Sequence, residues 1–100
     1  MDNTIRVLIK PPQKELKEVI INNQLTELQS WVGGMLEMVN ITHQLVLICN
    51  EEGKLHDLLP NFNFNNDIIM GTVIFARKEG DKLVSMQDAD ISFVEKFLAK

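Results

Sequence analysis

The sequence predicts a single α+β domain in which a largely antiparallel sheet is combined with two helices. A chain of 100 residues has the usual length of one domain. Its composition, 45% hydrophobic and 24% charged, is that of a folded protein. Short apolar runs separated by turn residues are interspersed with two stretches whose apolar residues recur at helical spacing. The expected order over residues 1–100 is strand, strand, helix, strand, strand, loop, strand, strand, helix.

Residues 4–9 form the first predicted strand, because Ile5, Val7 and Ile9 alternate with less apolar neighbours. The proline pair at 11–12 ends this strand, since proline cannot donate to a strand ladder. The β-rich run at 16–21 predicts a second strand, antiparallel to the first. A short helix is the alternative for this run.

A helix over residues 24–32 is the best-delimited element. Leu25, Leu28 and Trp31 lie at helical spacing and predict an amphipathic helix. The asparagine pair that precedes it is expected to cap its beginning. Gly33 is expected to end it, because glycine takes the left-handed conformation without steric cost.

The middle of the chain predicts two strands and a long loop. Residues 35–39 form one strand, and the nearly continuous apolar run at 44–49 indicates a central strand buried on both faces. Residues 50–53 have the composition of a turn. Residues 54–67 include Pro60 and four asparagines and are expected to form an irregular loop. Long loops in small domains often carry function.

The last third of the chain predicts two strands and a C-terminal helix. Residues 68–76 form a strand in which Gly71 marks a bulge or a close backbone approach, and residues 82–84 form a short one. Ser85 with Asp88 resembles a capping box. Ile91 and Val94 begin the apolar stripe of the helix. Because most strands follow one another by hairpins, we expect a largely antiparallel sheet with both helices on one face.

Charge and motifs favour binding over catalysis. Ten basic and 14 acidic residues give a net charge of −4, which disfavours non-specific nucleic-acid binding. The sequence has no P-loop and no G-x-S-x-G motif. Cys49 lies in an apolar run and is expected to be a buried hydrophobe rather than a nucleophile. The spacing of His43 and His56 does not require a metal. We therefore expect no enzyme activity, no cofactor and no metal.

The asparagines around the predicted loop are the best candidates for a binding site. Asn50 ends the buried strand, and Asn61 lies beside Phe62 and Phe64. Amides both donate and accept hydrogen bonds, and neighbouring aromatic rings suit a planar heterocycle with polar edges. The alternative is that the asparagines cap turns and the phenylalanines fill the core. For Trp31, core packing is favoured over base stacking.

Several segments resemble a small domain of unknown function that recurs in bacteriophages, plasmids and Firmicutes. The similarity covers nearly the whole chain. It lies in residues 5–11, 25–29, 32–34, 47–55, 60–61 and 67–72 and in the C-terminal helix, and it is most specific in Cys-Asn-Glu-Glu-Gly-Lys and Asp-Ile-Ile-Met-Gly-Thr. The family often has an arginine after the Pro-Asn pair, where this chain has Phe62 and Asn63. No enzyme chemistry is established for the family, so the resemblance implies a setting in phages and mobile elements rather than a mechanism.

The leading hypothesis is a non-enzymatic phage or mobile-element protein that binds a small nucleotide-like ligand, such as a bacterial immune signal that it sequesters as a counter-defence sponge. A protein-interaction module that inhibits a host enzyme or defence protein is the alternative, and an enzyme that degrades such a signal ranks third. The residues expected to bind the ligand are Asn50, Lys54, Asn61 and Thr72, with Lys10 and Arg77 for phosphate.

We also expect a homo-oligomer, because a domain of this size leaves much of its surface exposed to solvent. No apolar run approaches the ~20 residues that a membrane span needs. The sequence also opens without the pattern of a signal peptide. The expected location is the cytoplasm, which is the host cytoplasm if a phage encodes the protein.

Overall fold

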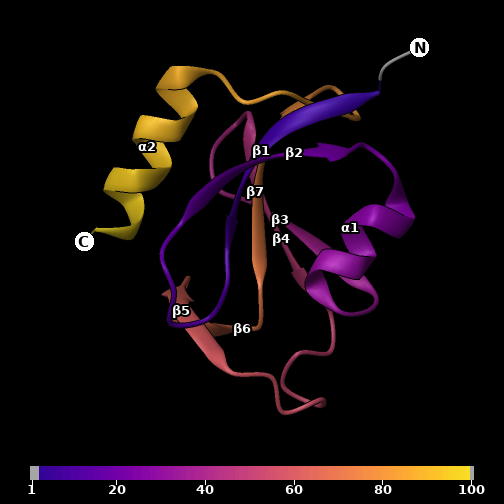
Figure 1. The fold of residues 1–100 in the computed structure, drawn as a ribbon. Helices are drawn as coiled ribbons and strands as arrows, with labels where there is room; N and C mark the ends of the chain where they lie inside the picture. The colour runs from indigo at the N-terminus through magenta and orange to yellow at the C-terminus, as the bar shows by residue number, and fades with distance from the viewer. Residues whose placement is uncertain (1–2, 100) are drawn as a thin grey trace.

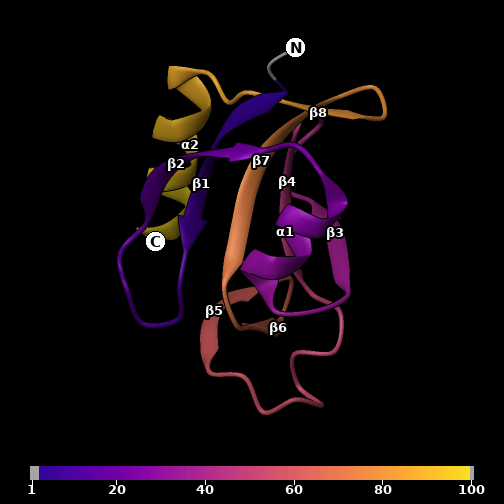
Figure 2. The same cartoon turned by 45° about the vertical axis from the view of Figure 1, so that its right-hand side comes forward.

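An antiparallel sheet of six strands forms the centre of the molecule and has one helix on each face (Figures 1 and 2). The computed structural model describes residues 3–99. The fold class is α+β, as predicted, and the order of elements agrees apart from one additional hairpin. In chain order the elements are β1 (Thr4–Lys10), β2 (Lys17–Asn22), α1 (Leu25–Val32), β3 (Leu36–Asn40), β4 (Leu45–Asn50), β5 (Pro60–Phe64), β6 (Asp67–Met70), β7 (Val73–Glu79), β8 (Lys82–Val84) and α2 (Asp88–Leu98).

Strands β7 and β4 form the middle of the sheet, whose order is β2-β1-β7-β4-β3, with β8 paired to the last part of β7. Ile74 of β7 lies opposite Ile9 of β1 on one side and opposite Ile48 of β4 on the other. All three side chains are fully buried. The predicted first hairpin and the predicted buried strand at 44–49 are both confirmed.

Each face of the sheet is covered by a different helix. On one face, Leu28 and Val32 of α1 pack in a cluster with Ile74. On the other face, Val94 of α2 packs in a cluster with Phe75. Because successive residues of a strand point to opposite faces, the apolar strand β7 needs cover on both. The prediction that both helices lie on one face is therefore wrong.

Glycine ends α1 as predicted, but the beginnings of both helices differ from the prediction. Gly33 caps α1 with φ +86°. The N-cap of α1 is Gln24, without a side-chain hydrogen bond, instead of the predicted asparagine pair. The capping box of α2 is formed by Gln87 and Asp90. Ser85, expected in that role, accepts a hydrogen bond from a backbone N–H of β1.

The segment predicted as a long irregular loop contains a second, two-stranded sheet. Turns fill residues 51–57, and β5 and β6 then pair through Asn65 and Asn66, which both have positive φ. Asparagine adopts this left-handed conformation more readily than most residues. The chain then changes direction at Gly71, where φ is +84°. The single strand predicted over 68–76 is therefore divided into β6 and β7.

Candidate functional site

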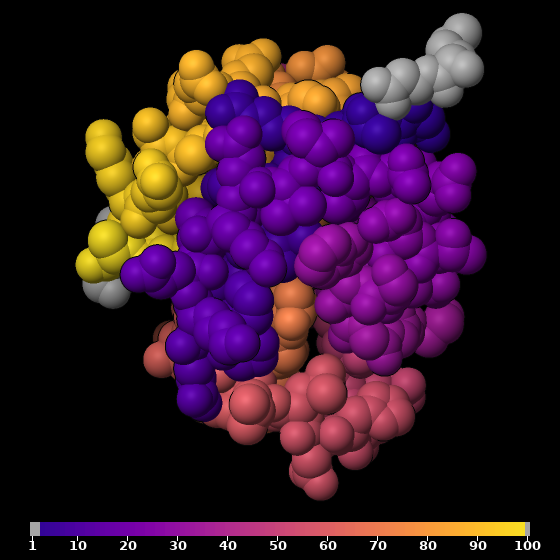
Figure 3. Space-filling model, in the orientation of Figure 1, coloured from indigo at the N-terminus to yellow at the C-terminus, as the bar shows by residue number. Residues whose placement is uncertain are grey.

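An open groove on the α1 side of the sheet is formed by four segments that are distant in the sequence, and we call it the Trp31 groove. Its volume is about 320 Å³. In Figure 3 it lies between the indigo β1–β2 segment and purple α1, above the salmon segment that leads into β5, with orange β7 visible at its floor. The lining residues are Pro12 after β1, Trp31, Val32 and Gly33 at the end of α1, Leu58 and Leu59 before β5, and Gly71 and Thr72 before β7.

Two glycines allow these segments to approach one another. Gly33 and Gly71 both have positive φ, which is unfavourable for a residue with a Cβ atom. A Cβ atom at Gly71 would also lie 2.7 Å from Cδ1 of Leu58. The close backbone approach that Gly71 indicates in the sequence is therefore present, and it brings Leu58 to the edge of the groove.

Asn50 joins the end of α1 to the turn that follows β4. Its side chain is buried, its Nδ2 donates to the carbonyl of Val32 at 3.2 Å, and its Oδ1 accepts from the N–H of Glu52 at 2.7 Å. Gly34 leaves room for this amide, because a Cβ atom there would lie 3.2 Å from Nδ2. Both ends of the Asn50 amide are engaged within the fold, so this residue supports the wall of the groove.

The groove itself has few polar side-chain groups. Nε1 of Trp31 donates to Oε2 of Glu27 at 3.0 Å, which holds the indole in place. The other oxygen of that carboxylate accepts from Nδ2 of Asn22 at 3.3 Å. The hydroxyl of Thr72 has no hydrogen-bond partner among the residues that the structure describes. This hydroxyl is therefore available to a ligand.

Lys10 and Asn61 contact each other and do not line the groove. Nζ of Lys10 donates to Oδ1 of Asn61 at 2.8 Å. Nδ2 of Asn61 donates to the carbonyl oxygens of Lys10 and Gly71, at 2.9 and 2.8 Å. These three hydrogen bonds attach the beginning of β5 to the end of β1 and to the residue that precedes Thr72.

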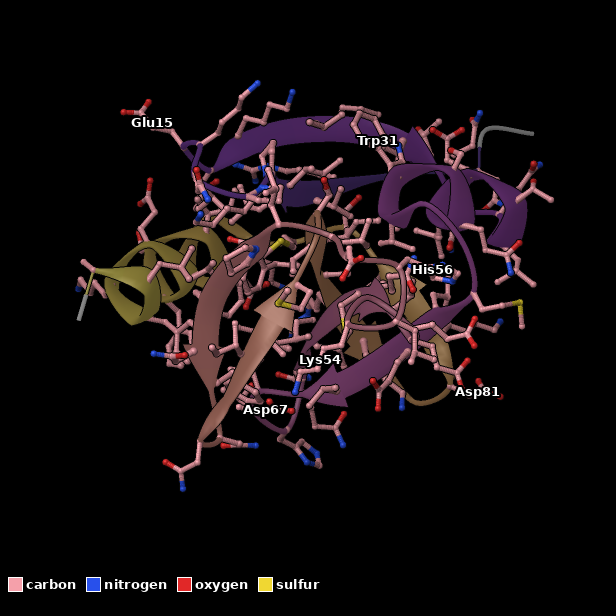
Figure 4. The ribbon with its side chains drawn as sticks, turned by 90° about the horizontal axis from the view of Figure 1, so that it is seen from below. Glu15, Trp31, Lys54, His56, Asp67 and Asp81 are labelled. Carbon is pink, nitrogen blue, oxygen red and sulfur yellow. The ribbon has the colours of Figure 1, made fainter. Side chains whose placement is uncertain are left out.

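Lys54 lies at a second hollow of about 190 Å³, next to the turn after β4. Its ammonium group is hydrogen-bonded to the carboxylate of Asp67, and the two residues lie side by side in Figure 4. This hydrogen bond is the main cause of the lowered pKa of Asp67, and the backbone N–H of Ile68 lowers that pKa further. Both charged side chains are exposed, so the pair is surrounded by solvent.

Arg77 is remote from both hollows and connects β7 to α2. Its guanidinium donates twice to the carboxylate of Asp90, at 3.0 and 3.1 Å. It also donates to Glu79 at 3.1 Å and to Gln44 at 2.9 Å. Only 12% of the side chain is exposed. The structure does not bring Arg77 near the other predicted site residues, and its donors are used within the fold.

The phenylalanines of β5 pack against β7 and α2. Phe62 stacks on Phe75 with ring centroids 5.9 Å apart, and Phe64 meets the edge of Phe97 at 5.8 Å. Phe62 also meets Phe97 edge-on. Phe62 and Phe64 are partly buried against the core on the α2 side of the sheet, which agrees with the alternative interpretation, and they do not line the Trp31 groove.

Titratable groups with ligating or nucleophilic chemistry do not cluster in the described part of the chain. Within residues 3–99, no three His, Cys, Asp or Glu side chains lie close enough to hold a metal ion. Cys49 is buried, and burial, with a smaller effect of Glu37, raises the pKa of its thiol to about 11. His43 and His56 are exposed. In the same residue range, no helix is long and apolar enough to cross a membrane.

The sequence predicts part of this site. Thr72 is a predicted ligand-binding residue and lines the groove. Trp31 packs against the core, as favoured, and lines the groove as well. Pro12, Leu58 and Leu59 are not predicted. The proline pair at least indicated a fixed change of chain direction, whereas two leucines in a polar segment indicate nothing about a groove.

Comparison with known proteins identifies the family. The family model described as a domain of unknown function, DUF3846, matches residues 5–99. The chain belongs to this family. No curated protein and no solved structure matches the chain. In this DUF3846 domain, residues 32–33 and 71–72, from two of the segments that carry the resemblance, line the Trp31 groove, and Asn50 from a third supports its wall.

Proposed function

We propose that this DUF3846 domain is a non-enzymatic binding protein that captures a small nucleotide-like ligand in the Trp31 groove. The observation that carries the proposal is that one open groove combines an indole, apolar walls and the Thr72 hydroxyl, which has no partner within residues 3–99. Small-molecule sites are concave and mostly apolar, with a few polar groups that fix orientation. Stacking of a base on an aromatic side chain contributes about 1–3 kcal/mol.

The two asparagines predicted to bind the ligand have an indirect role. The amides of Asn50 and Asn61 are engaged with backbone groups of the fold. An amide that already has its hydrogen-bond partners within the fold gains little by exchanging them for a ligand. Asn50 and Asn61 therefore act on binding indirectly, by holding the segments that line the groove, and Thr72 contacts the ligand directly.

The biological use that we propose is sequestration. The resemblance implies a setting in phages and mobile elements, and in such a setting the nucleotide signals of bacterial immunity are suitable candidates for the ligand. A sequestering protein needs a stable site and no chemical step. Capture therefore predicts that the bound compound is released unchanged when the protein is denatured.

The tryptophan fluorescence of the chain provides the test. Trp31 is the only tryptophan, and the chain has no tyrosine, so this emission reports on the groove alone. We would titrate the protein with nucleosides, cyclic nucleotides and ADP-ribose-type compounds, with calorimetry in parallel. A saturable change of emission and a matching heat are expected for at least one compound. Absence of both with every compound would contradict the proposal.

Two threonine variants locate the site. Thr72→Val keeps the shape of the side chain and removes the hydroxyl, so we expect affinity to fall about tenfold, equivalent to one lost hydrogen bond. Thr26→Val is the matched control, because Thr26 is exposed on α1 and does not line the groove. Unchanged affinity in Thr72→Val would place the ligand elsewhere. Intact compound recovered after denaturation separates capture from turnover.

A protein-interaction role is the second candidate, and it is supported by exposed leucines. Leu55 and Leu59 are 79% and 60% exposed in the segment between β4 and β5. Exposed apolar surface is typical of protein interaction sites, and these two leucines lie four residues apart in one segment. This role predicts that Leu55→Gln abolishes capture of a host protein and leaves ligand titrations unchanged.

A further inference from the structure

Resting on the proposed binding function, we infer that the Trp31 groove selects the uncharged or cationic heterocycle of its ligand and discriminates against phosphate. The lining residues given above include no ionisable side chain. A nucleoside can therefore enter without losing a charge interaction, whereas a phosphate that enters loses water and finds no cation.

The glycines of the groove do not form a phosphate cradle. Phosphate-binding loops present free backbone N–H groups to the anion. Here the N–H of Gly33 and that of Gly34 both donate to the carbonyl of Gln29, at 2.8 and 3.1 Å. The N–H of Gly71 donates to the carbonyl of Leu59 at 2.7 Å. The backbone at these glycines is therefore already paired.

The α1 wall of the groove carries negative charge. Trp31, Val32 and Gly33 form the C-terminal end of α1, where the helix dipole places partial negative charge. The carboxylate of Glu27 lies 3.0 Å from Nε1 of Trp31. An anion in the groove is repelled by both groups, and a cation over the indole is attracted by the ring as well.

The cations expected to hold phosphate are engaged elsewhere. Lys10 is hydrogen-bonded to Asn61, Lys54 to Asp67, and Arg77 to three acceptor side chains. None of these three cations lines the groove. The phosphates of a bound nucleotide would therefore remain in solvent, while the base lies against Trp31 and a base or sugar group bonds to Thr72.

The test compares the common ribonucleosides with their monophosphates and with a base-methylated, cationic nucleoside, each titrated into the full chain at low salt. We expect the nucleoside that binds to do so about fivefold to tenfold more tightly than its monophosphate. The cationic nucleoside is expected to bind at least as tightly as the neutral one. Added salt is expected to narrow the difference between nucleoside and monophosphate, because it screens repulsion.

Two charge variants test whether the carboxylate of Glu27 causes the preference for nucleoside over monophosphate. Glu27→Gln keeps an acceptor for Nε1 of Trp31 and removes the charge, so it is expected to reduce the preference for nucleoside over monophosphate at least twofold. Asp81→Asn changes the net charge equally, and Asp81 lies in the turn between β7 and β8, at the opposite end of β7 from Thr72. It is expected to leave the preference unchanged.

The outcomes separate this inference from the proposed function. Monophosphates that bind as tightly as nucleosides, or more tightly and with a loss on adding salt, would overturn the inference and leave the binding function standing. A preference that survives Glu27→Gln unchanged would also contradict it. If no nucleoside or monophosphate changes the emission of Trp31 but a cyclic nucleotide or an ADP-ribose-type compound does, the inference fails and the binding function stands. If none of these compounds gives a change of emission or a heat, both fail.

Discussion

The side chain of Asn50 holds the end of α1 against the turn after β4. Asn50→Ala leaves the buried carbonyl of Val32 and the partly buried N–H of Glu52 without these partners. We expect the free energy of unfolding to fall by about 2–3 kcal/mol, measured by denaturant titration. Asn63→Ala, at an exposed position of β5, is the control and should stay within about 0.5 kcal/mol of the unmodified chain. Equal losses in both variants would contradict the supporting role of Asn50.

Cys49 makes the stability of the protein depend on pH in the alkaline range. Burial raises the pKa of its thiol to about 11 in the folded state, above the ordinary value that it regains on unfolding. Between these two values the unfolded chain binds fewer protons than the folded chain, so stability falls as pH rises. We expect an additional loss on the order of 1 kcal/mol per pH unit between about pH 9 and about pH 11.

The comparison of the unmodified chain with Cys49→Ala isolates this effect. Other groups titrate in the same range and contribute equally to both proteins, so only the difference between the two stability curves belongs to Cys49. Parallel curves would show that the thiol ionises as easily in the folded protein as in the unfolded chain.

At the scale of elements, the β5–β6 hairpin depends on Asn61. Three hydrogen bonds of this side chain connect the hairpin to β1 and to Gly71. Asn61→Ala is expected to destabilise the protein by about 2 kcal/mol. It should also accelerate hydrogen exchange of the β5 and β6 amides before those of β4 and β7. The same acceleration in Asn63→Ala, or a uniform change over all strands, would contradict a local role for Asn61.

The sequence predicts best the elements that have a clear pattern of hydrophobic residues. Alternation identifies β1, the continuous apolar run identifies β4, and helical spacing ending at Gly33 identifies α1. The hairpin is not predictable in this way, because Pro60 and the asparagines have loop composition and tertiary contacts make the strands. The side of the sheet on which each helix packs is also hidden, since the period shows which face of a helix is apolar and not where it docks.

The candidate site is harder to predict for a related reason. An asparagine or arginine in the sequence shows that polar partners are needed, but not whether protein or ligand supplies them. Asn50, Asn61 and Arg77 find those partners within the fold. The groove depends instead on the positions of apolar residues such as Leu58, which can approach the backbone closely because Gly71 has no side chain.

At the scale of the whole molecule, the two edges of the sheet lead us to expect a homo-oligomer. β2 and β3 each have one neighbour in the sheet, and they carry Ile20, which is 61% exposed, and Met38, which is 44% exposed. An exposed edge strand with apolar side chains is a template for pairing with another copy. Sedimentation velocity should show a species larger than the monomer, and Ile20→Lys or Met38→Lys should dissociate it. A monomer at all concentrations would contradict this expectation.

The position of β7 in the sheet also determines at which stage of synthesis the two halves of the sheet can pair. β7 pairs with β1 near the beginning of the chain and with β4 in its middle, so the two halves of the sheet have no direct contact until residues 73–79 have been synthesised. Pairings between such distant segments form slowly, because loop closure precedes their gain in energy. A nascent chain that ends before β7 is therefore expected to expose the apolar faces of β1 and β4 and to bind chaperones. The complete sheet is expected to form only when the last third of the chain leaves the ribosome.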